Sequence, residues 1–246
     1  MHRPEPHAAY STPVVFLSGA LGLPQDWAGM VAHLAHRFSR IEIAETEALV
    51  AQSAGTGPCH VIAHGSAARG ALGTATLHPA RFRSLTLIDP DLGIETPARA
   101  AMIRRFETHC AEGDAFAATG TAVDHNCGPG TWARTAFPLQ QRLAARAGRI
   151  AAAMRPPQAE HTDAPDPAGC VCPSLVLTGA RAHAEIRSDY RRLHEALPLA
   201  RGTLIAEAGL FAHLTDPHVV DPLVCEFLVQ SERLWQGSER ELRLAT

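Results

Sequence analysis

The stretch HVIAHGSAARGALG, residues 60–73, decides the fold of this chain. Its first part is apolar enough for a buried strand, and its second part is rich in small residues that favour a helix. The two parts meet in a short turn, AHGSA, at residues 63–67. A serine nucleophile often occupies such a strand–turn–helix corner, in the pattern G-x-S-x-G. Here Gly65 stands at the central position, and Ser66 follows one residue late.

The composition favours one globular domain and argues against two partner classes. The chain has 246 residues, 46% of them hydrophobic, which suits one α/β domain with a large core, with or without an insertion. The net charge is -3 and no long run of one sign occurs, so we expect no nucleic-acid partner. No stretch approaches the length of a membrane span and no signal-like run opens the chain, so we expect no membrane partner and a cytoplasmic location.

Short apolar strands alternate with helical patterns on both sides of residues 60–73. Continuous apolar strands separated by helices are typical of a parallel sheet covered on both faces. The expected strands are 14–17, 40–45, 59–63, 84–90, 172–179 and 202–209. The expected helices are 26–38, a weak one at 46–55, 66–78, 185–197 and 216–230, with a polar helical tail to the end of the chain.

The segment 91–169 interrupts this rhythm. It contains helical runs at 98–120 and 139–155, joined by VDHNCGPGTW at 123–132, and it ends in a proline-rich surface connection at 156–169. We therefore expect an α/β core made of residues 1–90 and 170–246. A helical cap, residues 91–169, is inserted after the fourth strand.

Four phrases in this order resemble the α/β-hydrolase superfamily. They are residues 60–73, VVFLSGALGLPQDW at 14–27, LHPARFRSLTLIDP at 77–90 and GLFAHLTDPHVVDPLVCEFL at 209–228. The resemblance covers nearly the whole chain and is strongest for the small cap-bearing subgroup around the menaquinone-pathway lyases and related C–C or ester hydrolases. It implies a parallel sheet of about six strands, a cap and a pocket between them.

The resemblance places all three catalytic triad positions on residues that cannot transfer a proton. Pro79 lies fourteen residues after Gly65, which sets the register and puts Gly65 at the nucleophile position. The acid position falls on Ala182 and the histidine position on Leu210. Serine catalysis needs a nucleophile, a base and a group that orients the base. Ordinary serine hydrolysis is therefore not expected.

The backbone of the site is expected to survive the loss of these side chains. In the family, the loop that contains Ser18, Gly19 and Ala20 forms part of the oxyanion hole. The resemblance gives the N–H groups of Ala20 and Ser66 the two donor positions, and we expect them to converge beneath the cap. Gly65 adopts the strained turn at little cost.

The remaining polar residues give four candidate catalytic groups, His64, Ser66, Asp91 and His125. Ser66 is either a displaced nucleophile or, more simply, a serine that bonds the N-terminus of its helix. Asp89 is either the acid that some relatives keep after this strand or simply part of the I-D-P pattern that ordinarily ends it. His213 is either a pocket residue or a packed side chain. The pocket is expected to be lined also by Trp132 and Leu210, although residues 123–132 read equally well as a plain connection.

Neither the cysteines nor the histidines form a recognised metal motif. Cys170 and Cys172 form C-x-C at the start of a strand, where positions i and i+2 share a face. A metal clip is conceivable, but two reduced buried thiols are the simpler interpretation. The fourteen histidines are scattered without an H-E-x-x-H pair. We expect no metal and no cofactor.

Three functional hypotheses follow, all with a small-molecule substrate or ligand and none with a defined oligomeric state. The leading one is a non-hydrolytic enzyme of secondary metabolism, of lyase, cyclase or isomerase type, that uses the oxyanion hole on a partly apolar carbonyl compound. The second is a pseudoenzyme that binds a ligand or a partner protein. The third is an esterase or thioesterase that uses Ser66.

Overall fold

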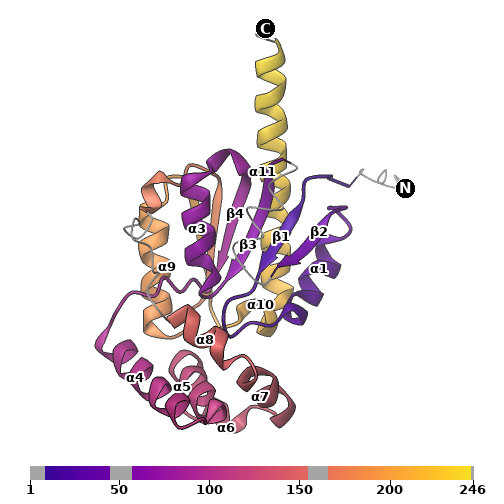
Figure 1. The fold of residues 1–246 in the computed structure, drawn as a ribbon. Coiled ribbons are helices and arrows are strands. Elements are labelled where there is room, and N and C mark those ends of the chain that lie inside the picture. The colour runs from indigo at the N-terminus through magenta and orange to yellow at the C-terminus, as the bar shows by residue number, and fades with distance from the viewer. Residues whose placement is uncertain (1–8, 45–56, 155–165, 245–246) are drawn as a thin grey trace.

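A computed structural model describes residues 9–44, 57–154 and 166–244. Its centre is a parallel sheet of six strands in the order β2-β1-β3-β4-β5-β6 (Figure 1). The strands are β1 (Val14–Leu17), β2 (Ile41–Ala44), β3 (Cys59–His64), β4 (Phe82–Ile88), β5 (Ser174–Gly179) and β6 (Ala200–Ile205). All six expected strands are present, which confirms the predicted fold class.

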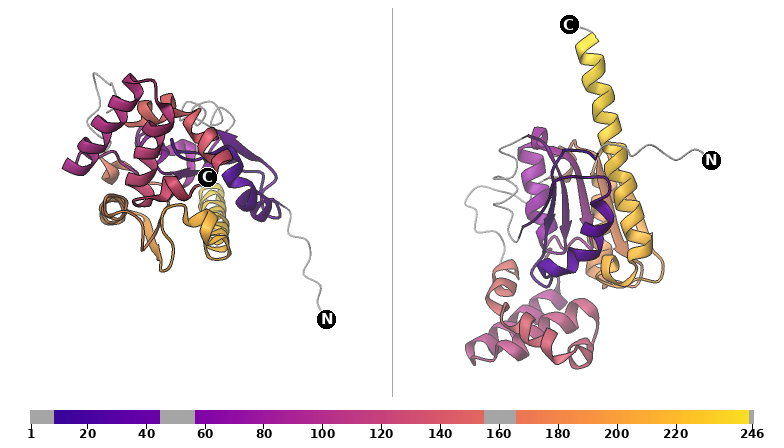
Figure 2. Two further views of the ribbon diagram at one scale, coloured as in Figure 1. Left: turned by 90° about the horizontal axis from the view of Figure 1, so that it is seen from below. Right: turned by 90° about the vertical axis from the view of Figure 1, so that its right-hand side faces the viewer.

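Helices cover both faces of the sheet (Figure 2). One face packs against α3 (Ala67–Leu77) and α9 (Ala184–Ala196), and the other against α1 (Ala28–Leu34) and α11 (Pro217–Leu244). Successive side chains of a strand point to opposite faces. Accordingly Val15 packs on the α3 side and Phe16 on the α1 side, both fully buried. Burial on both faces explains why these strands are continuously apolar.

Some helix boundaries differ from those expected. The helix expected at 26–38 begins as a 3-10 turn, η1 (Pro24–Trp27), and α1 itself ends at Leu34. The last expected helix and the polar tail form one helix, α11, which extends beyond the sheet on the side away from the cap (Figure 2). The helix expected at 46–55 and most of the connection at 156–169 lie outside the described residues.

The helices between β4 and β5 gather at the carboxyl ends of the strands (Figure 1). We call them the cap: α4 (Pro97–Ala111), α5 (Ala115–Cys127), α6 (Thr131–Arg134), α7 (Phe137–Ala144) and α8 (Ala147–Met154). The run expected at 98–120 is split, because the Asp114 side chain accepts a bond from Ala117 N and caps α5. The expectation of a connection from 123 was wrong, because α5 continues to Cys127.

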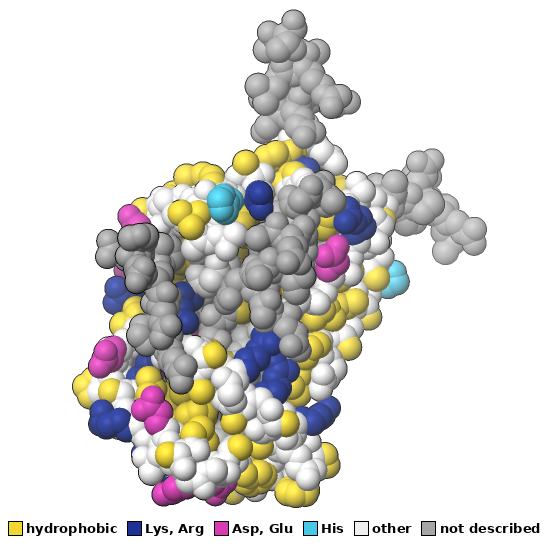
Figure 3. Space-filling view, in the orientation of Figure 1, with side chains coloured by type: hydrophobic (Ala, Val, Ile, Leu, Met, Phe, Trp, Pro, Cys, Tyr) yellow, Lys and Arg dark blue, Asp and Glu magenta, His cyan; other side chains and the backbone are white. Residues whose placement is uncertain are grey.

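The described surface carries no element that could span a bilayer, since no described helix is long and apolar enough to do so. On the face in Figure 3, acidic and basic side chains are interspersed with apolar ones.

The C-x-C pair lies just before β5. The Sγ atoms of Cys170 and Cys172 are 3.5 Å apart and both residues are buried. This thiol contact lowers the pKa of Cys170 to about 7.

Candidate active site beneath the cap

The site forms where the strand order reverses. From β1 the chain passes first to β2 on one side and then to β3 on the other, so the loops after β1 and β3 diverge. Ligands of open α/β sheets bind at such a switch point, outside the carboxyl ends of the strands. A Cβ on Gly19 would lie 2.6 Å from the His64 carbonyl oxygen, so the loop after β1 passes this close to the turn only because Gly19 has no side chain.

Gly65 forms the corner after β3 with a φ of 60°, a left-handed conformation that glycine adopts without strain. Its N–H donates to the Ile88 carbonyl at 3.0 Å, and its carbonyl accepts from the Asp91 N–H at 3.1 Å. The turn is therefore tied to the end of β4. A Cβ built on Gly65 meets no atom within 4 Å. The space that a nucleophilic side chain would occupy is open.

Of the two roles considered for Ser66 from the sequence, the structure does not show the capping role. It is the N-cap residue of α3, yet its side chain makes no capping bond. Instead its Oγ accepts a hydrogen bond from the Ala20 N–H at 3.0 Å. The expectation that the Ala20 N–H is a free oxyanion-hole donor was therefore wrong. This N–H donates to the Ser66 hydroxyl oxygen, and the hydroxyl keeps its own proton, which it can donate to another acceptor.

A cavity of about 50 Å³ lies at the turn, between the sheet and the cap, and we call it the main cavity because it contains the turn. Seven predicted site residues line it: Gly19, Ala20, His64, Gly65, Ser66, Asp91 and Leu210. Apolar cap residues, including Met102 and Ile150, close the other side. About 10–15 Å³ of such volume is enough for one water molecule, so this cavity suits only a small ligand.

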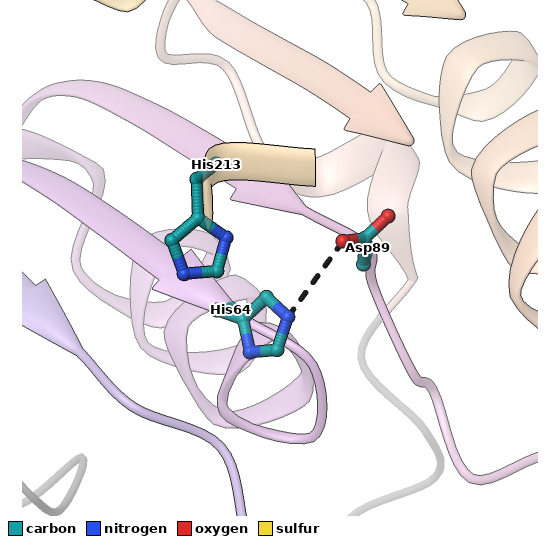
Figure 4. Close-up of side chains that lie close together, drawn as sticks. All are labelled: His64, Asp89 and His213. Atoms are coloured by element: carbon teal, nitrogen blue, oxygen red, sulfur yellow. Dashed lines mark ion pairs between the residues drawn. The ribbon is translucent and has the colours of Figure 1, made fainter. Parts of the chain in front are cut away.

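A buried polar cluster borders this cavity (Figure 4). It joins His64 at the end of β3, Asp89 after β4 and His213 on α10 (Ala212–Thr215). His64 Nε2 lies 3.7 Å from Asp89 Oδ2, an ion-pair contact that is too long for a hydrogen bond. The two imidazole centroids are 4.8 Å apart. His213 also stacks on Trp27, with ring centroids 4.6 Å apart.

Asp89 is the electrostatic centre of the cluster. It is fully buried and accepts from Thr178 Oγ1 and Phe211 N, both at 2.8 Å, and from two further backbone N–H groups at 3.3 Å. Burial opposes ionisation, but the contacts with His64 and Thr178 outweigh it and lower the pKa of Asp89. Asp89 is therefore an ionised carboxylate that faces His64, and not merely part of a strand-end phrase.

His213 is a packed and uncharged side chain. Burial, aided by the nearby His64, lowers its pKa to about 3. Its Nδ1 is buried without a hydrogen-bond partner. His213 is not among the described residues that line the main cavity. This placement matches the packed interpretation of the two considered from the sequence.

Asp91 lines the cavity but is held by a cation. Its carboxylate pairs with the Arg99 guanidinium, with Nη1 and Oδ1 3.0 Å apart, and it also accepts from Gly93 N at 2.9 Å. Arg99 lines the same cavity and is 6% exposed, so the pair is largely desolvated. The sequence did not single out Arg99. Its place in a helical run, eight residues after Asp91, was the available signal.

The other predicted residues lie away from the main cavity. Ser18 accepts from Trp27 Nε1 at 2.9 Å and lines an adjoining cavity of about 260 Å³. Trp132 lines a cavity of about 500 Å³ within the cap. Ala182 is buried beside α9. His125 faces His183 and Glu185, and its neighbour Asn126 lines the main cavity instead.

Comparisons with known proteins identify the fold. No family model matches the sequence, and no curated protein matches it. Among solved structures, an α/β hydrolase from Sphaerobacter thermophilus is 20% identical, with a TM-score of 0.68 over 89% of this chain and 93% of that one. A thermophilic esterase from Thermogutta terrifontis is 20% identical, with a TM-score of 0.65 over 91% of each chain. MenH from S. aureus is 13% identical, with a TM-score of 0.67 over 93% of this chain and 97% of that one.

These proteins belong to the α/β-hydrolase superfamily, and the likeness extends over nearly their full length. The chain therefore has the α/β-hydrolase fold, the class that its four sequence phrases resemble. Identities of this size establish the fold and not the reaction.

Proposed function

We propose that this chain is a non-hydrolytic enzyme of α/β-hydrolase fold in which His64 moves a proton on a small, partly apolar carbonyl compound. The observation that carries the proposal is the buried His64–Asp89 pair at a cavity whose nucleophile position is an open glycine. An ionised carboxylate beside an imidazole orients the ring and stabilises the imidazolium that forms on proton transfer. Without a nucleophile, the pair serves proton abstraction rather than acyl transfer.

The Ser66 hydroxyl supplies the electrophilic side of this chemistry. It accepts from Ala20 N, which polarises it, and it lines the same cavity as His64. A substrate carbonyl placed over Gly65 would accept the hydroxyl proton in a hydrogen bond as negative charge develops on its oxygen. The oxyanion hole is thus used through Ser66 rather than through two free backbone donors.

The rest of the cavity wall sets the substrate class. Met102, Ile150, Ile186 and Leu210 are apolar, and the Asp91–Arg99 pair is internally neutralised. A small ketone with one polar oxygen and a short hydrocarbon part suits such a wall. Lyase, cyclase and isomerase reactions that pass through an enolate begin with proton transfer next to such a carbonyl group.

Deuterium exchange tests the proposal without knowledge of the natural substrate. The full-length protein is incubated in D₂O with acetone, butanone and cyclopentanone, and loss of the α-proton signals is followed by proton NMR. We expect exchange faster than in buffer for at least one ketone, loss of that excess in His64→Gln, and no change in His218→Gln, which alters an exposed histidine. Excess exchange that persists in His64→Gln would refute the role of His64.

A ligand-binding pseudoenzyme is the second candidate, and the residues Gly65, Ala182 and Leu210 at the three triad positions favour it. Ketones that raise the melting temperature without any excess exchange would support this candidate over the enzyme. The third hypothesis, a hydrolase that uses Ser66, has less geometric support. No histidine among the described residues hydrogen-bonds the Ser66 hydroxyl. Fluorophosphonate labelling at Ser66 would nevertheless reinstate it.

A further inference from the structure

Three side chains that commonly bind metals meet where the cap reaches the core. His125 lies near the end of α5, His183 is the N-cap residue of α9, and Glu185 lies in the first turn of α9. His125 Nε2 is 3.0 Å and His183 Nδ1 is 3.9 Å from the same carboxylate oxygen, Glu185 Oε2. All three donor atoms lie within 4.8 Å of one another.

This spacing is close to that of a tetrahedral metal site. Bonds of about 2.0–2.1 Å in a tetrahedral zinc site place the donor atoms about 3.3 Å apart. The two measured separations, 3.0 and 3.9 Å, bracket that value. Two imidazoles and one carboxylate also form a ligand set found in zinc enzymes, with the fourth position open to water. Small side-chain rotations would therefore suffice to bring all three atoms onto one ion.

One ring nitrogen of His183 lacks a hydrogen-bond partner. His183 Nδ1 is buried and makes no hydrogen bond, although the rest of the ring is partly exposed. A buried polar atom without a hydrogen-bond partner destabilises the fold, and a metal ion would remove that penalty.

The Glu185 carboxylate is oriented by a hydrogen bond to its other oxygen. The Thr96 hydroxyl donates to Oε1, which leaves Oε2 turned to the two histidines. Thr96 itself is held at the start of α4, where its Oγ1 accepts from Arg99 N at 3.0 Å. Such outer hydrogen bonds are what orient metal ligands in proteins.

We propose that His125, His183 and Glu185 bind one Zn²⁺ ion, which clasps the cap to the α/β core. His125 belongs to the cap and the other two ligands belong to the core, so the ion would join the two parts. The next residues along the chain from two of the ligands, Asn126 and Ile186, line the main cavity. The ion would thereby fix the distance between the cap wall and the core wall of that cavity.

Metal titration of the full-length protein tests this site directly. After treatment with EDTA and its removal, ZnCl₂ is titrated by calorimetry, and Co²⁺ is used as a probe because tetrahedral Co²⁺ absorbs visible light strongly. We expect one saturable site per chain, a Co²⁺ spectrum of tetrahedral type, and a Zn²⁺-dependent rise in melting temperature. Glu185→Gln and His183→Ala should each weaken Zn²⁺ binding. The loss of affinity should exceed the factor of about 10–100 that removal of an outer hydrogen bond typically causes.

Matched variants separate this site from the alternatives. His218→Ala changes an exposed histidine and should bind Zn²⁺ as the wild type does. Cys170→Ser with Cys172→Ser should also retain binding, and so should His64→Gln. Glu185→Gln can still accept from Thr96, so it decides the question even if His183→Ala fails to fold. Absence of a one-to-one site, full binding in Glu185→Gln, or loss of binding in the cysteine variant would overturn the proposal.

Discussion

Replacement of His213 by phenylalanine should make the protein less sensitive to mild acid. His213 is 5% exposed, stacks on Trp27, and has its pKa lowered from 6.5 to about 3, first by burial and then by His64. The unfolded chain therefore binds a proton at this residue near pH 6.5, whereas the folded chain does not. Stability from this source is complete above pH 6.5 and falls as the pH drops toward 3. At pH 5 the loss is about 2 kcal/mol.

Urea denaturation at pH 7.5 and at pH 5.0 measures how much free energy of unfolding each protein loses in acid. Between these two pH values, His213→Phe should lose about 2 kcal/mol less than the wild type. Any packing strain from the larger ring affects both pH values equally and cancels. His218→Gln, at an exposed histidine, should behave as the wild type. An equal acid loss in His213→Phe and the wild type would show that His213 is protonated in the folded protein.

Three further predictions concern the turn and its supports. Asp89→Ala should destabilise the fold by about 3–6 kcal/mol, because two 2.8 Å bonds to a buried charge are lost, and Asp89→Asn by about half as much, both measured by urea denaturation. Gly65→Ser should lower the free energy of unfolding, followed by thermal melts, by about 1–2 kcal/mol, because the φ of 60° at this position is unfavourable for serine. The variant should not be labelled by fluorophosphonate, because Leu210 occupies the position of the catalytic histidine. Ser66→Ala should cost about 1 kcal/mol through the unpaired Ala20 N–H, and should lower any excess ketone exchange 100-fold or more. Wild-type stability in Asp89→Ala, labelling of Gly65→Ser, or unchanged exchange in Ser66→Ala would each contradict the site geometry.

The sheet and its turn were predictable because short-range rules determine them. The apolar strand before Gly65 and the small residues after it indicate a strand, a tight corner and a helix. The structure has this arrangement, from β3 to α3. The cap was less predictable in detail. The alanine-rich runs of the cap contain few residues that signal where a helix ends. The break before Ala115 depends on the side chain of Asp114, which caps the next helix.

The side-chain network of the site was not predictable to the same degree. Ala20 and Ser66 are 46 positions apart, and Asp89 and Phe211 are 122 apart, so only the folded sheet brings them into contact. The sequence left two roles open for Ser66, a displaced nucleophile and a local capping bond, and the second is the commoner role of a helix N-terminal serine. The close approach of the loop after β1, made possible by Gly19, offers the hydroxyl a different donor.

The orientation of His64 restricts what the site can do. In serine triads the carboxylate holds the histidine through Nδ1, and Nε2 faces the nucleophile. Here Asp89 faces Nε2, and the other ring nitrogen, Nδ1, points away from the carboxylate (Figure 4). An ionised Asp89 favours the tautomer with the proton on Nε2, which leaves the lone pair on Nδ1. Under the proposed function, His64 would therefore take the proton through Nδ1. A substrate that placed its acidic carbon in the open space at Gly65 would be excluded by a serine side chain at that position.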